Sequence, residues 1–167
     1  IPFVDSSSLK TKEEQSQVIS NLEKILPLLE EYDIFLTLET DLPPISFKEL
    51  ILSFNHPNIK ANYDVGNSAS LGYDMKEELN LYGDLICNVH IKDRKYRGQT
   101  VPLGSGDTDF ELFFNLLQKT NYSGELIIQG AREYDVKPEE TCMKYLQFVK
   151  KFVDKYQLYN NNGSNGT

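Results

Sequence analysis

The sequence predicts an α/β fold with a parallel sheet, organised as a partial (β/α)8 TIM barrel of about strands 4 to 8 with their helices. Short apolar runs alternate with longer segments of helical period, as in strands joined by crossover helices. The glycine motifs that hold phosphates in dinucleotide-binding and P-loop folds are absent. A whole barrel typically needs about 250 residues. The 167 residues here supply only five strand-like runs, which indicates the C-terminal part of a barrel.

Two of the five predicted strands are apolar almost without interruption, at residues 34–38 and 126–128. This pattern is typical of parallel strands that are buried on both faces. The chain starts within the first run and without Met, so we expect a missing segment upstream. In order, the predicted strands are residues 1–5, 34–39, 59–65, 85–92 and 125–129.

Four helix starts are predicted from the capping-box spacing, in which a Ser, Thr or Asp side chain bonds the amide three residues on and a Glu there bonds back. A fifth helix is expected at Pro138, because proline suits a first helical turn. Pro27 predicts a kink or a restart within the first helix. The four capping pairs are Thr11 with Glu14, Ser46 with Glu49, Asp74 with Glu77, and Thr108 with Glu111.

Composition and charge exclude several classes of partner. A net charge of -8 gives no basis for holding nucleic acid, whose phosphates require clustered Lys and Arg. No apolar run is long enough to span a membrane and no signal peptide is visible, so we expect a cytoplasmic protein without a membrane partner. Cys87 and Cys142 match no metal or redox spacing and are expected to be buried thiols.

The predicted domain occupies residues 1–158, and residues 159–167 form a polar tail that is expected to be disordered. Five strands of an eight-stranded barrel would leave two sheet edges and an inner face open. We therefore expect an upstream segment or a second chain to complete the barrel.

Polar side chains end four of the predicted strands. In a parallel barrel such groups converge on one face, at the carboxyl ends of the strands. Two carboxylates, an imidazole and an amide oxygen suit Mn²⁺, Mg²⁺, Co²⁺ or Zn²⁺. The alternative is a histidine satisfied within the core and acids that cap the following helices. The four residues are Glu39, Asp64, His90 and Gln129.

Four segments resemble the xylose-isomerase-like TIM-barrel family of sugar and sugar-phosphate isomerases and epimerases. They are residues 38–44, 62–67, 90–94 and 101–110, and the resemblance extends from the start of the chain to about Lys155. It implies that Glu39, Asp64 and His90 bind a divalent metal ion. It also implies that Glu39 moves protons next to the substrate carbonyl.

Gln129 departs from the family pattern, which usually has Glu at this position. An amide oxygen can bind a cation, but an amide cannot take up and return a proton near neutral pH. Epimerisation usually takes a base on each face of an enediolate, whereas isomerisation can use one. The sequence thus indicates an enzyme with one base, Glu39, in which Gln129 impairs or changes catalysis. A non-catalytic carbohydrate-binding or regulatory module, or an engineered Glu→Gln change, remains as an alternative.

Four further residues are candidates for binding a small sugar or sugar phosphate: Asn67, Lys92, Arg94 and Arg132. Ordinary turn chemistry for Asn67 and solvated surface charge for the three cations are the alternatives. The glycine-containing loop 101–107 is expected to be either a lid or a tight turn. A multi-zinc endonuclease is excluded, because that chemistry needs several histidines and a basic surface, and the chain has two histidines.

Overall fold

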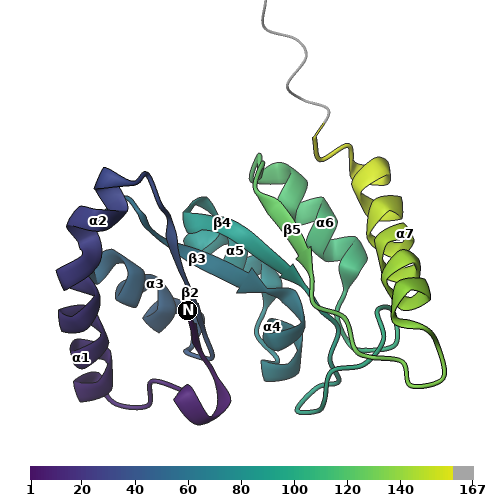
Figure 1. Cartoon of the computed structure of the whole chain (residues 1–167), viewed down its shortest axis with the longest axis horizontal. Helices are drawn as coiled ribbons and strands as arrows, with labels where there is room; N and C mark the ends of the chain where they lie inside the picture. The colour runs from purple at the N-terminus through teal and green to yellow at the C-terminus, as the bar shows by residue number, and fades with distance from the viewer. Residues whose placement is uncertain (160–167) are drawn as a thin grey trace, which may run out of the picture.

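The computed structural model describes residues 1–159, and its centre is one parallel sheet of five strands (Figure 1). The strands lie side by side in the order in which they occur in the chain, and each neighbouring pair is parallel. This order is that of consecutive strands in a (β/α) barrel, and it confirms the predicted fold class. The strands are β1 (Pro2–Phe3), β2 (Leu36–Thr40), β3 (Ile59–Asp64), β4 (Ile86–Ile91) and β5 (Glu125–Ile128).

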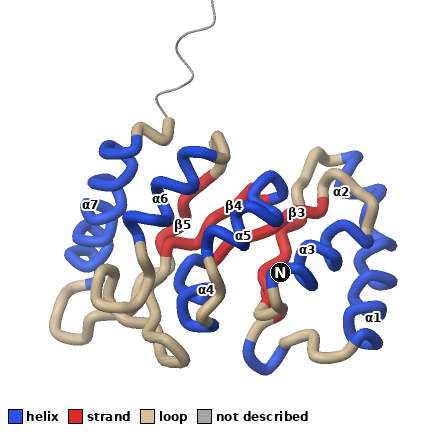
Figure 2. The backbone as a smooth tube through the Cα atoms, turned by 180° about the vertical axis from the view of Figure 1, so that it is seen from behind, coloured by secondary structure: helices blue, strands red, loops and turns tan. Residues whose placement is uncertain are grey.

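Helices cover one face of this sheet. In Figure 1, α5 and α6 lie behind the strands, and in the reverse view of Figure 2 they lie in front of them. The core fills the space between, where Leu38, Val89 and Phe113 are completely buried. The helices are α1 (Lys12–Leu22), α2 (Leu26–Glu31), α3 (Pro44–Ser53), α4 (Val65–Leu71), α5 (Met75–Tyr82), α6 (Phe110–Lys119) and α7 (Pro138–Tyr156), with 3₁₀ turns at Asp5–Ser7, Glu23–Ile25 and Gly83–Leu85.

Three of the five predicted helix starts are confirmed. Thr11 and Glu14 form the full capping box before α1, the Asp74 side chain caps α5, and Pro138 lies in the first turn of α7. The restart predicted near Pro27 is also confirmed, because α1 ends at Leu22 and α2 begins at Leu26 with the proline in its first turn.

The other two predicted caps are wrong. Helix α3 begins earlier, at Pro44, whose fixed φ suits the first turn, so Ser46 lies inside the helix. Helix α6 is capped by Asp109, whose carboxylate accepts the amide of Leu112 at 2.9 Å. Thr108 is engaged elsewhere, since its hydroxyl donates to the carbonyl of Lys92.

Burial on both faces of the sheet, which the apolar strands predicted, is wrong for part of the sheet. Ile34 and Phe35, just before β2, are about half exposed, and Ile127 of β5 is 42% exposed. The reason is that among residues 1–159 the helices cover only one face. Within these residues no helix covers the inner face of the sheet, which includes the exposed Ile127.

The cysteines also differ from expectation, since Cys87 is half-buried and Cys142 is exposed. Cys142 lines a surface hollow between α7 and the loop after β5 rather than the core. Of the predicted tail, residues 160–167 lie outside the described part. Tyr159 donates its hydroxyl to the carbonyl of Gly124 at 2.9 Å. No helix in the described part of the chain is long and apolar enough to cross a membrane.

Candidate active site

Three neighbouring strands bring Glu39, Asp64 and His90 together. Glu39 lies near the end of β2, Asp64 ends β3, and His90 on β4 is in register with Asp64. Each residue offers one ligand atom, and these atoms lie within 4.8 Å of one another. His90 Nδ1 is 3.2 Å from Glu39 Oε2 and 4.0 Å from Asp64 Oδ2. The parallel register thus converts three separate strand ends into one cluster of donors.

Both carboxylates are buried, with Glu39 8% and Asp64 4% exposed. Burial alone would raise the pKa of Glu39, but bonds from His90 and Asn62 and the charges of His90 and Lys92 hold that pKa below its usual value. For Asp64 burial prevails and the pKa is raised, although Lys92 and a backbone amide oppose the shift. The two acids therefore differ in the direction in which the site shifts their pKa values.

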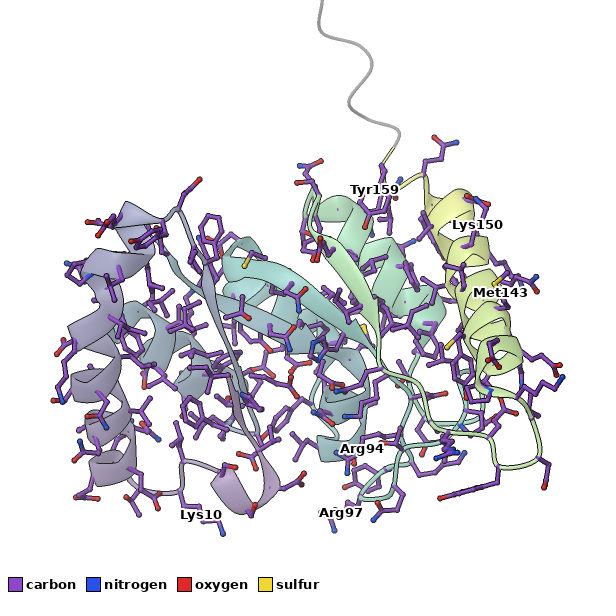
Figure 3. All side chains as sticks on the ribbon, viewed as in Figure 1. Lys10, Arg94, Arg97, Met143, Lys150 and Tyr159 are labelled. Atoms are coloured by element: carbon purple, nitrogen blue, oxygen red, sulfur yellow. The ribbon has the colours of Figure 1, made fainter. Side chains whose placement is uncertain are left out.

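Two amide side chains hold the oxygens of Glu39. Asn62 Nδ2 donates to Oε2 at 2.6 Å, and Asn67 Nδ2 donates to Oε1 at 2.7 Å. Asn67 is itself oriented by Arg94, whose Nη1 donates to its oxygen at 2.8 Å. Arg94 is labelled in Figure 3, below the end of β4. Arg94 therefore orients Asn67, and Asn67 in turn binds Glu39. Both were predicted as substrate-binding residues.

Asn62 was missed in the sequence analysis. It lies two residues before Asp64 on β3, and residues two apart on a strand share a face. The same alternation could have identified it, together with Asn88, whose Nδ2 donates to Asn62 Oδ1 at 2.6 Å. The inner face of the sheet therefore carries two hydrogen-bonded amide side chains, Asn62 and Asn88, beside the acids and the imidazole.

The two carboxylate oxygens of Asp64 have different hydrogen-bond partners. Oδ1 accepts the amide of Asn67 at 2.8 Å and caps α4, the helix that follows β3 at once. Oδ2 faces the Nζ of Lys92 at 3.2 Å. The cap fixes the carboxylate, so that Oδ2 points toward the cluster. Helix α4 itself was not predicted.

A hollow of about 300 Å³ lies over these side chains, large enough for a small sugar. Gln129, directly after β5, borders it with an exposed side chain, and its backbone amide donates to the carbonyl of Ile91 at 2.9 Å. Arg132 lies elsewhere, on the hollow beside α7. The lining residues of the first hollow are Ile1, Pro2, Val4, Asp5, Thr37, Glu39, Asn62, Asn67, Asn88, His90, Lys92 and Gln129.

The loop after β4 is pinned by Asp93, which sequence reasoning also missed. This carboxylate is 1% exposed and accepts the amides of Gly104 at 2.9 Å, Gly106 at 2.7 Å and Thr108 at 3.2 Å. Loop 101–107 is therefore a turn held against the end of β4.

Another buried carboxylate, Glu78 of α5, lies on the helix side of the sheet and holds residues next to the site. It is 3% exposed and accepts the hydroxyls of Tyr63 at 2.8 Å and Tyr82 at 3.0 Å, as well as that of Ser68. Burial is the main cause that raises its pKa. Because Tyr63 and Ser68 flank Asp64 and Asn67 in the chain, Glu78 ties β3 and α4 to α5.

Comparison with known proteins starts from a family model. Residues 4–152 match the model described as the xylose isomerase-like TIM barrel. A putative L-ribulose-5-phosphate 3-epimerase of Haemophilus influenzae is 34% identical over 110 residues, which are 62% of this chain and 37% of that protein. The L-ribulose-5-phosphate 3-epimerase of Escherichia coli O1:K1 is 33% identical over 103 residues, 61% of this chain and 36% of that protein. The matched region is thus little more than a third of these relatives.

Solved structures show the same fold. A xylose isomerase domain protein from Planctomyces limnophilus aligns with a TM-score of 0.77 and 20% identity, over 89% of this chain and 58% of that one. The IOLI protein with a binding zinc atom aligns with a TM-score of 0.74 and 20% identity, over 87% of this chain and 59% of that one. The five strands and their helices therefore correspond to somewhat more than half of a barrel.

Proposed function

The chain belongs to the xylose isomerase-like TIM barrel family, and from that premise we propose that it carries the metal and sugar site of a sugar-phosphate isomerase or epimerase. The observation that carries the proposal is the convergence of Glu39, Asp64 and His90 at three neighbouring strand ends. The printed names of the curated relatives, L-ribulose-5-phosphate 3-epimerases, support a sugar phosphate as substrate. In this proposal residues 1–158 form the C-terminal portion of the barrel.

The donor set fits a divalent metal ion. Two carboxylates and an imidazole within 4.8 Å of one another suit Mn²⁺, Mg²⁺, Co²⁺ or Zn²⁺. Glu39, Asp64 and His90 would hold it, and Gln129 lies at the same hollow as a further contact to metal or substrate. Such an ion, when bound, polarises a carbonyl oxygen and stabilises the negative charge that develops there.

Glu39 is the proposed acid and base. Its lowered pKa keeps it ionised at neutral pH, so that it can accept a proton from the carbon next to the substrate carbonyl. The substrate then becomes an enediolate, and Glu39 returns the proton to a carbon of it. Asn67 holds the carboxylate in place during both transfers, because its NH₂ group donates to Oε1.

Gln129 limits the chemistry to one face. Because an amide does not take up protons near neutral pH, we propose that Glu39 removes and returns the proton on the same side of the enediolate, which gives aldose–ketose isomerisation rather than epimerisation. Lys92 is the cation at this hollow and faces Asp64, where it can also attract an anionic group of the substrate.

The test is turnover by the full protein that contains this sequence, incubated with Mn²⁺ and ketopentose phosphates in D₂O and followed by proton NMR. We expect interconversion of sugars and uptake of deuterium at the carbon next to the carbonyl. Glu39→Gln should lower the rate by about 10²–10⁴-fold, the usual contribution of a general base. Metal binding without turnover or deuterium uptake on any of these sugars would contradict the proposed chemistry.

Gln129 also favours a second candidate function, a non-catalytic carbohydrate-binding or regulatory module. In that case the protein would bind the sugar phosphate but exchange no deuterium, and Gln129→Glu would restore exchange. The first candidate instead requires exchange in the natural protein.

A further inference from the structure

We propose that Asn62 supplies an oxygen ligand to the metal ion, as a fourth protein donor beside Glu39, Asp64 and His90. The proposal rests on the proposed function in so far as it concerns the same metal. It adds a residue that neither the resemblance nor the comparisons assign.

Asn62 lies directly beside two of the proposed metal donors. Its amide nitrogen lies 2.6 Å from Glu39 Oε2 and 3.1 Å from His90 Nδ1, and those two atoms are 3.2 Å apart. Atoms that bind one metal ion with bonds of about 2.0–2.1 Å are separated by about 3 Å. The outer end of the Asn62 amide is thus close enough to Glu39 and His90 to bind the same cation.

Asn62 presents its NH₂ group to these two atoms. The NH₂ group lies against Glu39 Oε2 and His90 Nδ1, the atoms that a cation would use. The oxygen and the NH₂ of an Asn amide have nearly the same size, so a half turn of the amide exchanges them. After that turn the oxygen would lie beside Glu39 and His90, which would hold the cation, and the NH₂ would face Asn88. A matching turn of Asn88 then offers its oxygen as the acceptor, in place of the present bond from Asn88 to Asn62.

Burial distinguishes Asn62 from Gln129 as the amide donor. Asn62 is 6% exposed and sits in the middle of the sheet, where β2 and β4 flank its strand on both sides. Gln129 is exposed and lies just beyond the end of the edge strand β5. A donor on a rigid, doubly paired strand is held in place before the metal arrives, which lowers the cost of ordering it on binding.

The experiment measures metal affinity and the visible absorption of bound Co²⁺ in the full protein. Mn²⁺ titrations compare the natural protein with Asn62→Ala, Asn62→Asp and Gln129→Ala, and Asn80→Ala serves as a control at an exposed amide of α5. We expect Asn62→Ala to weaken Mn²⁺ binding by about 10–100-fold, and Gln129→Ala to weaken it less. Asn62→Asp keeps an oxygen at the site and should bind Mn²⁺ at least as tightly as the natural protein, with an altered Co²⁺ spectrum.

Two results would overturn the inference while leaving the proposed function intact. One is unchanged Mn²⁺ affinity in Asn62→Ala. The other is equal weakening in Asn62→Asp and Asn62→Ala, because the NH₂ group rather than the oxygen would then be needed. If the natural protein binds neither Mn²⁺ nor Co²⁺, the metal-dependent function fails together with the inference. Melting curves without metal show whether each variant is folded. If Asn62→Ala does not fold, the comparison of Asn62→Asp with the natural protein still tests the inference.

Discussion

Glu39 is the residue on which the hydrogen bonds of the site converge. Asn67 donates to one oxygen, and Asn62 and His90 lie against the other. Removing a carboxylate from water costs several kcal/mol unless such donors replace the lost hydration. The buried but ionised Glu39 therefore depends on its amide neighbours, which explains why the site contains more amides than the metal donors alone require.

Glu78 is a buried acid in a different state. Its folded-state pKa is raised above the ordinary value of 4.5, so ionisation is less favourable in the folded protein than in the unfolded chain. Its contribution to stability is therefore present below that value and is lost as the pH rises through the raised pKa. The loss begins as the pH rises above the ordinary value.

Glu78→Gln removes this loss, because the amide does not ionise. The stability of Glu78→Gln relative to the natural protein should therefore increase as the pH rises from about 4 to about 7. Urea unfolding at both pH values measures the two free energies of unfolding. A stability difference that is the same at the two pH values, or that falls as the pH rises, would refute the assignment. Glu77→Gln, one residue away and exposed, is the control.

At the scale of elements, the contact between α4 and the end of β4 sets the position of the site. Gly66 lies in the first turn of α4, and a Cβ atom added there would lie 2.8 Å from the backbone carbonyl carbon and oxygen of Lys92. Backbone atoms cannot turn aside as a flexible side chain can, so the whole helix would have to move. Asp64 caps this helix and Asn67 belongs to it, so the movement would reach Glu39.

Gly66→Ala should consequently reduce stability by about 1–3 kcal/mol, the usual cost of overpacking. It should also weaken metal binding, because the bond from Asn67 to Glu39 is stretched. Urea unfolding and a Mn²⁺ titration measure the two effects. Leu71→Ala on the same helix, where the side chain is 40% exposed, is the control and should change neither quantity appreciably. Equal behaviour of the two variants would show that the close approach at Gly66 has no consequence.

At the scale of the whole molecule, the sheet has two edges and one uncovered face. Within residues 1–159, β1 and β5 each pair with one neighbour only, and the inner face carries the candidate site together with the 42% exposed Ile127. Unpaired edges offer free backbone donors and acceptors to other chains. We therefore propose that further strands, from the same protein or from a second chain, complete the barrel around the site.

The 167-residue chain by itself should then associate or unfold without a sharp transition. Size-exclusion chromatography with light scattering measures its mass, and thermal unfolding followed by circular dichroism measures its cooperativity. A monomer of 19.2 kDa with one cooperative transition would contradict the expectation.

The sequence by itself determined the parallel α/β architecture, three helix starts and the restart at Pro27. It also selected Glu39, Asp64 and His90, because an apolar run, a cap and a polar residue at a strand end are all local patterns. Only the tertiary structure decided that one face of the sheet is open and that Cys142 is exposed. It alone revealed Asn62, Glu78 and Asp93, whose partners lie 10 to 28 residues away in the chain, apart from Tyr82, which is four residues from Glu78. Hydrogen bonds of that kind depend on the register between strands and on the packing of helices, which no local pattern encodes.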